Sequence, residues 1–434
     1  MKPQNKPSIK PHFLIAPNAF KNSLSAGEAA LAIRNGLLQS GLECTCECFP
    51  IGDGGDGTVD LIIERLGGTR SKAEARDPLG RKITTYFGLI TSSAPTAATT
   101  PAPATPAPPA AATRASPELR PSLPLARTLR SARVPPTALI EMANASGLRL
   151  LANNELNPLL ALSHGTGELI RIALDKKARR IIIGMGGSAT VDGGTGILEA
   201  LGVRFLDNKG TPLKDLPQSL INLASIDTSG LDPRLSDTEL IILCDVDNRL
   251  LGPSGSAAVF GPQKGATPQA VEKLDSALSR LSEIVLEQTG RDMTKVMYGG
   301  TAGGAAAGLY GLLNATLVNG IDYFLEITDF DKALSSATWV ITGEGSIDEQ
   351  TLHGKGPFGV ASRAKNAGLP VIGLAGRVPL EPSAGLKKYF DTLLAIGNGP
   401  TDFSNALKNT AANLARTAET IGHLLNQIHN YPKP

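Results

Sequence analysis

The chain has few of the residues on which several protein classes depend. Its 434 residues include 4 cysteines, 5 histidines and 4% aromatic residues. So few cysteines in a chain of this length do not form a disulfide framework, which is typical of a reduced, cytoplasmic location. The first apolar run, Phe13–Ala16, is too short for the core of a signal peptide, and no run approaches a membrane span. We therefore expect a cytoplasmic protein without a membrane partner.

Charge of one sign is also missing. Lys+Arg 42 against Asp+Glu 40 gives a net charge of +2, which excludes a strongly basic nucleic-acid-binding protein. Residues 91–136 carry five arginines and one glutamate, so the rest of the chain is slightly acidic. This balance is ordinary for an enzyme that acts on small molecules.

Cys44, Cys46 and Cys48 alternate along one short run. On a strand all three face the same side. A metal site is the alternative, but this spacing lacks a second cluster of ligands. The run therefore predicts a half-buried strand.

Residues 91–136 have a composition of their own. This segment contains 11 prolines and 12 alanines, which together make up half of it. Proline removes backbone donors, and such a sequence buries too little apolar surface to fold. We predict a disordered or polyproline-like insertion at a loop tip, and a short basic helix at Arg127–Arg133 is the alternative.

Elsewhere strands and helices alternate along the chain. Ser25 and Glu28 form a capping box that begins a helix ending near Gln39. Further helices are predicted at Thr58–Leu66, Gly167–Asp175, Pro268–Gln288, Pro357–Ala367 and Phe403–Ile428. Strands are predicted at His12–Ala16, Cys44–Ile51, Thr69–Ala75, Lys82–Gly88, Thr137–Met142, Arg180–Ile183, Glu239–Cys244, Trp339–Thr342 and Val371–Ala375.

This order predicts two α/β domains. The β-α-β-α rhythm at both ends is typical of a parallel sheet covered by helices, so residues 1–66 and 290–434 are expected to build one open sheet together. Residues 67–289 contain extra extended runs and form a mixed α/β domain inserted into it.

Five loops rich in glycine and acidic residues follow predicted strands, where α/β proteins bind ligands. They are Ala16–Ser23, Gly52–Gly57, Gly184–Gly194, Cys244–Asn248 and Gly343–Asp348. Glycine lets backbone N–H groups point at phosphate oxygens, whereas carboxylates hold Mg²⁺ or accept a proton from an attacking hydroxyl. Together these residue types favour phosphoryl transfer.

Known nucleotide motifs give a weaker signal. The P-loop motif and the protein-kinase motif set are both absent from the sequence. Gly184, Gly186 and Ala189 fit a loose dinucleotide fingerprint, with Asp207 near the expected distance. An NAD-dependent oxidoreductase is therefore an alternative, although glycines at 193, 194 and 196 fit an extended anion-binding loop better than the start of a helix.

Taken together, the loops resemble the glycerate kinase family of the bacterial glycerate 2-kinase type. The matching segments run in order from about His12 to the C-terminus and are interrupted at residues 91–136. They are Ala16–Ala26, Asp53–Thr58, Ile140–Leu148, Gly165–Glu168, Gly186–Gly194, Cys244–Asn248, Val259–Ala266, Ala302–Gly304, Ile341–Asp348 and Gln350–Lys355.

The resemblance implies two unequal α/β domains, one of them flavodoxin-like, with substrates in the cleft between them. It implies ATP-dependent phosphorylation of D-glycerate, usually at the 2-hydroxyl to give 2-phosphoglycerate. Phosphorylation of the 3-hydroxyl is an alternative. Mg²⁺ and ATP are the expected cofactors, and the protein is expected to be a monomer or a homodimer.

Individual roles are hypotheses within this family. Asp192 is the expected base, because it lies inside the anion-binding loop; Asp245 is the alternative, or it holds Mg²⁺ together with Asn248. Lys21 and Lys355 are expected to neutralise phosphate oxygens. The nucleotide is expected to contact Gly186, Gly187, Ser188, Thr190, Gly193, Glu344 and Asp348, and the substrate to contact Lys264, His353, Lys355, Asp53 and Asp56.

The chain departs from the family pattern at three positions. Asn18 and Ala19 stand where the family usually has Asp and Ser, Asp56 stands for a usual Glu, and Val191 for a common Asn. Because of Asn18 and Ala19, an alternative remains that the protein is a non-catalytic sensor, which binds small acids in the same pocket but does not turn them over.

Overall fold

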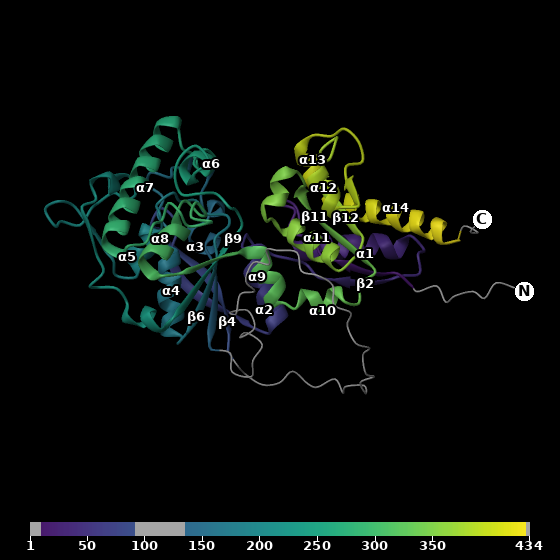
Figure 1. The fold of residues 1–434 in the computed structure, drawn as a ribbon, viewed down its shortest axis with the longest axis horizontal. Helices are drawn as coiled ribbons and strands as arrows, with labels where there is room; N and C mark the ends of the chain where they lie inside the picture. Colours follow the sequence, from purple (N-terminus) through teal and green to yellow (C-terminus); the bar gives the residue numbers. More distant parts are fainter. Residues whose placement is uncertain (1–9, 92–134, 431–434) are drawn as a thin grey trace, which may run out of the picture.

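The computed structural model describes residues 10–91 and 135–430, so nearly all of the predicted Ala- and Pro-rich insertion lies outside the described residues. Figure 1 shows two α/β domains side by side. One is built from both ends of the described chain and is called here the terminal domain. The other is built from the middle of the chain and is called the middle domain.

The terminal domain contains a sheet of parallel strands. Its order within the described residues is β13-β12-β11-β1-β2. The strands are β1 (His12–Ile15), β2 (Thr45–Cys48), β11 (Trp339–Ser346), β12 (Val371–Arg377) and β13 (Thr392–Ala395). The first and last thirds of the chain therefore share one sheet, as the sequence predicts.

Helices cover both faces of this sheet. They are α1 (Ala26–Gln39), α10 (Phe330–Leu334), α11 (Gly356–Asn366), α12 (Ala384–Tyr389), α13 (Phe403–Lys408) and α14 (Thr410–Asn430). Phe13 and Ile15 of β1 are buried against α1 and α14, whereas Leu14 is buried in the cluster that includes α11. Because side chains alternate along a strand, one strand serves both layers, as in a flavodoxin-like domain.

The middle domain contains a mixed sheet in the order β10-β9-β6-β5-β4-β3 within the described residues. The strands are β3 (Thr69–Arg76), β4 (Lys82–Ile90), β5 (Thr137–Glu141), β6 (Arg180–Gly184), β9 (Glu239–Cys244) and β10 (Thr316–Asn319). A separate hairpin pairs β7 (Arg204–Leu206) with β8 (Ser225–Asp227). Strand β4 runs antiparallel to both of its neighbours, β3 and β5, whereas β5, β6, β9 and β10 are parallel to one another. The prediction of a mixed α/β domain is confirmed.

Helices pack on both faces of this second sheet. They are α2 (Thr58–Leu66), α3 (Ala143–Ser146), α4 (His164–Asp175), α5 (Thr195–Ala200), α6 (Ser256–Phe260), α7 (Pro268–Thr289), α8 (Ala305–Leu313) and α9 (Gly320–Ile327). Ile241 of β9 belongs to the same hydrophobic cluster as Leu14 of β1 and Phe324 of α9. The two domains therefore share a continuous core.

The predicted domain limits differ from the sheet pairing at two points. Residues 290–319 are predicted to belong to the terminal domain, but β10 pairs with β9 and α8 packs beside β9 and β10. Similarly, α2 packs on β4 and β5 although residues 1–66 are predicted to be terminal. Both differences arise because β-α alternation gives the order of elements and not the sheet that each one joins.

The long predicted helix Phe403–Ile428 is divided in the structure. Helix α13 ends at Lys408 and α14 begins at Thr410, with Asn409 between them. Apolar spacing continues through the break, so periodicity alone does not reveal it. By contrast, α1 begins after Ser25 with the predicted capping box. Within the described ranges, no helix is long and apolar enough to cross a membrane.

Candidate active site

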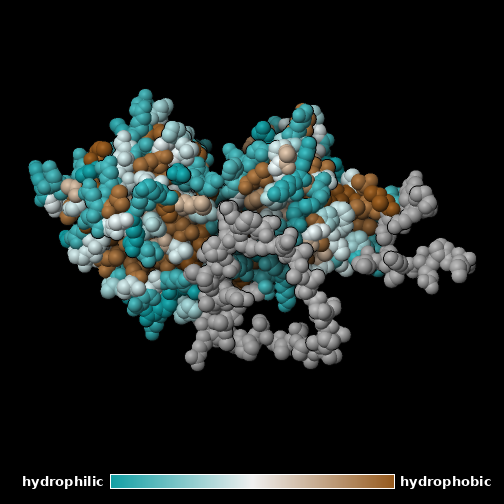
Figure 2. Space-filling model, viewed as in Figure 1, coloured by the Kyte–Doolittle hydropathy of each residue, from teal (hydrophilic) through white to brown (hydrophobic). Residues whose placement is uncertain are grey.

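A cavity of about 700 Å³ lies at the carboxyl edge of the terminal sheet. Strands β1 and β11 are neighbours there, and the chain leaves them in opposite directions, toward β2 on one side and β12 on the other. This divergence is where open α/β sheets bind ligands. It is lined by the loop after β1, the carboxyl ends of β11 and β12, the residues after β13 and Lys355, together with Asp245, which follows β9 of the middle domain. We call it the main cavity; a space-filling view shows a hollow between the two domains (Figure 2).

Acidic side chains surround Lys21 in the main cavity. Burial alone lowers the pKa of this lysine, but Asp53, Asp245 and Glu344 outweigh it and raise the pKa above the ordinary value. Lys21 is thus held as a cation. Lys355, which precedes α11, lines the same cavity. Two cations and three carboxylates from distant parts of the chain therefore meet at one place.

Two of these carboxyl groups have unusual pKa values. Burial, together with the nearby charge of Asp53, raises the pKa of Asp245 to about 6, although Lys21 and Lys264 oppose the shift. Burial also raises the pKa of Glu344 to about 7, against the effect of Lys355. Groups with pKa values near neutrality can exchange protons at physiological pH, and such groups cluster at functional sites.

Asn18, one of the departures from the family pattern, is part of this network. Its side-chain Nδ2 donates to Asp53 Oδ2 at 2.8 Å, and its Oδ1 accepts from the backbone N–H of Ala19 at 2.8 Å. An aspartate at this position would face Asp53 with a like charge. Asn18 instead orients Asp53 without adding charge, a contact that the motif comparison does not reveal.

The glycine-rich loop after β6 packs closely against the loop after β2. The N–H of Gly186 donates to the carbonyl of Gly54 at 2.9 Å. A Cβ at Gly186 would lie 2.4 Å from Gly55 Cα and 3.2 Å from Asp245 Oδ2, and Gly187 has φ +71°. Glycine is needed here for close approach between loops, and the Gly186 N–H is not free to bind phosphate.

Lys264 lies behind this loop, outside the lining of the main cavity. It is 3% exposed, and its Nζ donates to Ser188 Oγ at 2.8 Å and to the Thr190 carbonyl at 2.7 Å. Burial lowers its pKa to about 7, although Asp192 and Asp245 oppose the shift. The predicted contact of Lys264 with glycerate is therefore not formed by this arrangement, and Lys264 instead fixes the loop that carries Ser188 and Thr190.

The structure contradicts Asp192 as an accessible base. The residue is fully buried, and its carboxylate accepts from Ser163 N (2.9 Å), Ser163 Oγ (2.6 Å), Gly194 N (3.0 Å) and Gly196 N (3.1 Å). These bonds satisfy donors at the starts of α4 and α5. Asp192 is a structural cap because a carboxylate enclosed by four donors cannot reach a substrate hydroxyl.

We expect Asp192→Ala to lower the free energy of unfolding by about 3 kcal/mol, because it leaves several buried donors without an acceptor. Urea denaturation measures this loss. The control is Asp207→Ala, which also removes an acceptor of two backbone N–H groups but at a less buried loop, and whose effect is expected to be small. A kcat loss of 100-fold in Asp192→Ala with unchanged unfolding would instead restore Asp192 as the base.

Several other predicted residues are used elsewhere. Gly193, at φ +61°, packs against Leu281, and Asp348 caps the 3₁₀ turn at Glu349–His353.

The exposed Asp56 pairs with Arg149 at 3.6 Å but still contributes to the charge around Lys21. The Nδ2 of Asn248 donates to the Ser254 carbonyl at 2.9 Å, which turns that side chain away from a shared metal position with Asp245. Across residues 10–91 and 135–430, no three His, Cys, Asp or Glu side chains gather in a metal-binding group.

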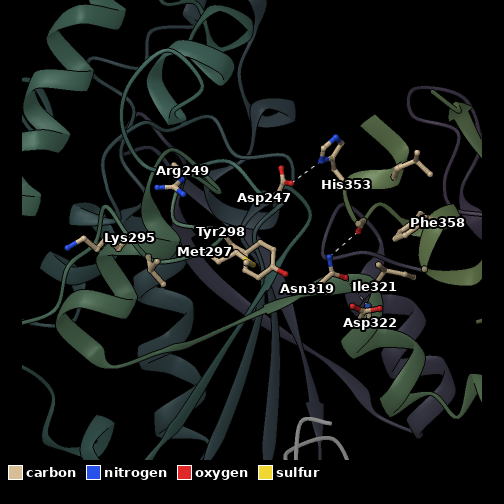
Figure 3. A pocket seen from close by; sticks show the side chains of 14 residues that line it. Asp247, Arg249, Lys295, Met297, Tyr298, Asn319, Ile321, Asp322, His353 and Phe358 are labelled. Carbon is tan, nitrogen blue, oxygen red and sulfur yellow. Dashed lines mark hydrogen bonds and ion pairs between the residues drawn. The ribbon is translucent and has the colours of Figure 1, made fainter. Parts of the chain in front are cut away.

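His353 lines a second cavity, of about 410 Å³, between the two domains (Figure 3). We call it the junction cavity. His353 Nδ1 lies 3.2 Å from Asp247 Oδ2 across it, and Asn319 Nδ2 donates to the Gly354 carbonyl at 3.1 Å. The loops after β9 and around residue 354 thus serve both cavities, with Asp245 and Lys355 in one and Asp247 and His353 in the other. His353 is not brought to the main cavity.

The comparisons with known proteins agree with this architecture. A family model described as the glycerate kinase family matches residues 13–426. The chain belongs to the glycerate kinase family. The family prediction made from the sequence motifs is confirmed, and the dinucleotide-fingerprint alternative receives no support.

Individual relatives cover nearly the whole chain. A protein named glycerate kinase from Bacillus subtilis (strain 168) is 40% identical over 94% of this chain and 96% of its own length. A glycerate 2-kinase from Escherichia coli (strain K12) is 37% identical over 93% of this chain and 97% of its own. A crystal structure of a protein assigned as glycerate kinase 2 from Salmonella typhimurium LT2 has 38% identity and a TM-score of 0.73, covering 97% of this chain and all of that one. The last match supports the two-domain fold.

Proposed function

We propose that this kinase transfers the γ-phosphoryl group of ATP to the 2-hydroxyl of D-glycerate and releases 2-phosphoglycerate and ADP. One observation carries the proposal. Lys21, Lys355, Asp53, Asp245 and Glu344 converge from both domains on a single cavity at the topological switch point of a parallel sheet. Membership of the glycerate kinase family and the similarity to a glycerate 2-kinase support the choice of substrate and hydroxyl.

Lys21 and Lys355 would neutralise the phosphate oxygens as charge moves toward ADP. Their ammonium groups reach the cavity from loops after different elements, so a triphosphate between them is held at two points. Fixed cations of this kind stabilise charge that develops in the transition state. They also hold the γ-phosphorus in line with the attacking hydroxyl.

Asp245 is the base in this proposal, in place of Asp192. Its carboxylate accepts the hydroxyl proton as the glycerate oxygen bonds to the γ-phosphorus and the bond from phosphorus to the β-bridging oxygen breaks. Asp245 comes from the middle domain and faces Lys21 of the terminal domain. Closure of one domain on the other would therefore bring base and phosphate together.

Asp53 and Glu344 fit a Mg²⁺ ion that arrives with ATP. Both carboxylates face the main cavity, and oxygen ligands of this kind suit a hard cation that remains partly bound to phosphate. The ion would supply charge neutralisation of the β- and γ-phosphates. Asn18 keeps Asp53 oriented toward the same space.

The activity is expected to fall below an apparent pKa of about 6. Asp245 works as a carboxylate, and its pKa in the folded protein is about 6, so acid protonates it and stops proton transfer. The profile of kcat/KM against pH should rise through this value and then level off. A profile that stays flat down to pH 5 would exclude Asp245 as the base.

Product analysis tests the proposed reaction. Purified protein is incubated with Mg-ATP and D-glycerate, ADP release is followed, and the product is examined by proton-coupled phosphorus NMR. A phosphate on the 2-position is split into a doublet by one proton, whereas a phosphate on the 3-position is split into a triplet by two. The triplet would assign the product to the alternative, 3-phosphoglycerate.

A sensor without turnover is a second candidate because of Asn18 and Ala19. Asn18 replaces a usual acid beside the main cavity, where it donates a hydrogen bond to Asp53. Calorimetry that detects ATP and glycerate binding, with no ADP formed over hours, would favour this candidate over the kinase.

A further inference from the structure

The main cavity is lined by charged residues at one end and by apolar residues at the other. Its charged residues lie beside β1 and β11, whereas Ile396 follows β13, two strands further from β1. Adjacent strands are about 4.8 Å apart, so the two ends differ in position by about 10 Å along the sheet. The end near β13 is lined by the apolar side chains Ile396, Phe403, Ala406 and Leu407. We call it the apolar end.

Side-chain contacts hold the walls of the apolar end in place. Ser23 Oγ, in the loop after β1, donates to the carbonyl of Leu407 at 2.6 Å and so ties α13 to the loop that carries Lys21. Arg416 of α14 donates to the carbonyls of Ile396 (2.9 Å) and Gly397 (3.2 Å) at the end of β13. The apolar end is therefore a formed site between α13, α14 and β13. Apolar and aromatic side chains of this kind suit a heteroaromatic ring.

Asn413 contributes a buried amide to this end. The residue lies on α14, is 6% exposed and lines the main cavity. Its side-chain amide has no hydrogen-bond partner among the residues that the structure describes. Thr410, one turn earlier, differs because its hydroxyl donates to the carbonyls of Ala406 and Leu407. The amide atoms of Asn413 are not enclosed by packed side chains but reach the cavity, so a ligand bound there can complete their hydrogen bonds.

We propose that Asn413 reads the adenine base of the phosphoryl donor and sets the preference of this kinase for ATP over GTP. This inference rests on the proposed function and adds the specificity-determining residue. The amide oxygen accepts from the exocyclic amino group of adenine, and the amide nitrogen donates to the neighbouring ring nitrogen. The same edge of guanine presents two acceptors, so one of its bonds to Asn413 is lost.

The rest of the cavity is consistent with this orientation. With the base between Phe403 and Ile396, the triphosphate extends along the sheet edge past Arg377 toward Lys21 and Lys355. Arg377 is the last residue of β12, the strand between the two ends. Phe403 is 74% exposed at the rim of the apolar end, where an aromatic ring can stack on any base without distinguishing it.

Asn413→Asp tests the proposal by changing the hydrogen-bonding pattern without changing the shape. A carboxylate only accepts, so it loses the bond to the adenine ring nitrogen. Guanine gains no bond at the edge that presents two acceptors, but when it turns to present its Watson–Crick edge, both N–H groups there can donate to the carboxylate. We expect the dissociation constant for ATP, measured by calorimetry, to rise about 10-fold or more and the ratio of ATP to GTP affinity to fall further. In turnover, KM for ATP rises while kcat and KM for D-glycerate stay within about twofold.

Two further variants complete the test. Asn409→Asp makes the same chemical change at an exposed position outside the cavity lining and is expected to leave both nucleotide affinities unchanged. Phe403→Ala removes an exposed ring, so this variant is expected to fold. It should lower the affinity for ATP and for GTP to the same extent. Melting temperatures confirm that Asn413→Asp is folded.

The outcomes separate this inference from the proposed reaction. If Asn413→Asp binds ATP and GTP with the wild-type ratio, Asn413 does not read the base, whatever the enzyme does with glycerate. If wild-type protein binds ATP and the ratio shifts in the variant but no phosphoglycerate forms, the base site stands and the proposed reaction fails. Binding by calorimetry needs no turnover, so both results can be obtained.

Discussion

Asp245→Asn is expected to lower kcat by about 10²- to 10⁴-fold, the range for loss of a positioned general base. The amide keeps the size of the side chain and the contact with the Gly186 loop, but it cannot take the proton of the attacking hydroxyl. Steady-state ADP release with saturating D-glycerate and Mg-ATP measures the loss.

The same variant is expected to be more stable than the wild type at neutral pH. Burial raises the pKa of Asp245 from 3.8 in its ordinary state to about 6. A carboxyl group with a raised pKa contributes most to stability below its unfolded pKa, and that contribution is lost as pH rises through the folded value. At pH 7.5 the wild type therefore bears the cost of a buried carboxylate that asparagine removes. A higher Tm together with a lower kcat would mark a catalytic role.

Asp247→Asn is the matched control, because it makes the same change two residues further along the same loop. Asp247 lines the junction cavity and faces His353. Its kcat is expected to stay within about threefold of the wild type, since the residue lies outside the main cavity. If Asp245→Asn kept more than a tenth of the wild-type kcat, the base would have to be sought elsewhere.

Lys21→Met is the second change with a large expected effect, a loss of about 10²- to 10³-fold in kcat/KM. Without the ammonium group, the negative charge that Asp53, Asp245 and Glu344 present to the triphosphate is offset less, because Lys355 alone remains of the two cavity lysines. Because Lys21 also lowers the pKa of Asp245, its loss should move the acidic limb of the pH profile to higher pH.

The variant Lys21→Arg tests whether the positive charge at position 21 is sufficient or whether the shape of the lysine side chain is also needed. Lys21→Arg retains the positive charge and is expected to recover part of the activity and the wild-type position of the acidic limb. Lys295→Met removes an exposed lysine that pairs with Asp292 outside the main cavity and should leave kcat/KM unchanged. An unshifted pH profile in Lys21→Met would contradict the proposed contact between Lys21 and Asp245.

The local signals in the sequence were reliable wherever the structure depends on neighbouring residues. The capping box at Ser25, the strand with alternating cysteines and the helix Thr58–Leu66 are all present, since caps and side-chain periodicity act over one or two turns. The motifs also indicated Lys21, Asp53, Asp245, Glu344 and Lys355 as site residues, and these residues line one cavity.

Which side chains reach that cavity was decided only by the tertiary structure. Asp192 and Asp245 both follow strands in acidic, glycine-rich loops, but one is enclosed by donors of Ser163 and α5 while the other faces Lys21. The sheet joined by β10, the break before α14 and the free amide of Asn413 likewise depend on packing between segments far apart in the chain. Sequence motifs determine the chemistry that each loop can offer, whereas burial and hydrogen-bond partners, which come from distant residues, determine whether a given group is available to perform it.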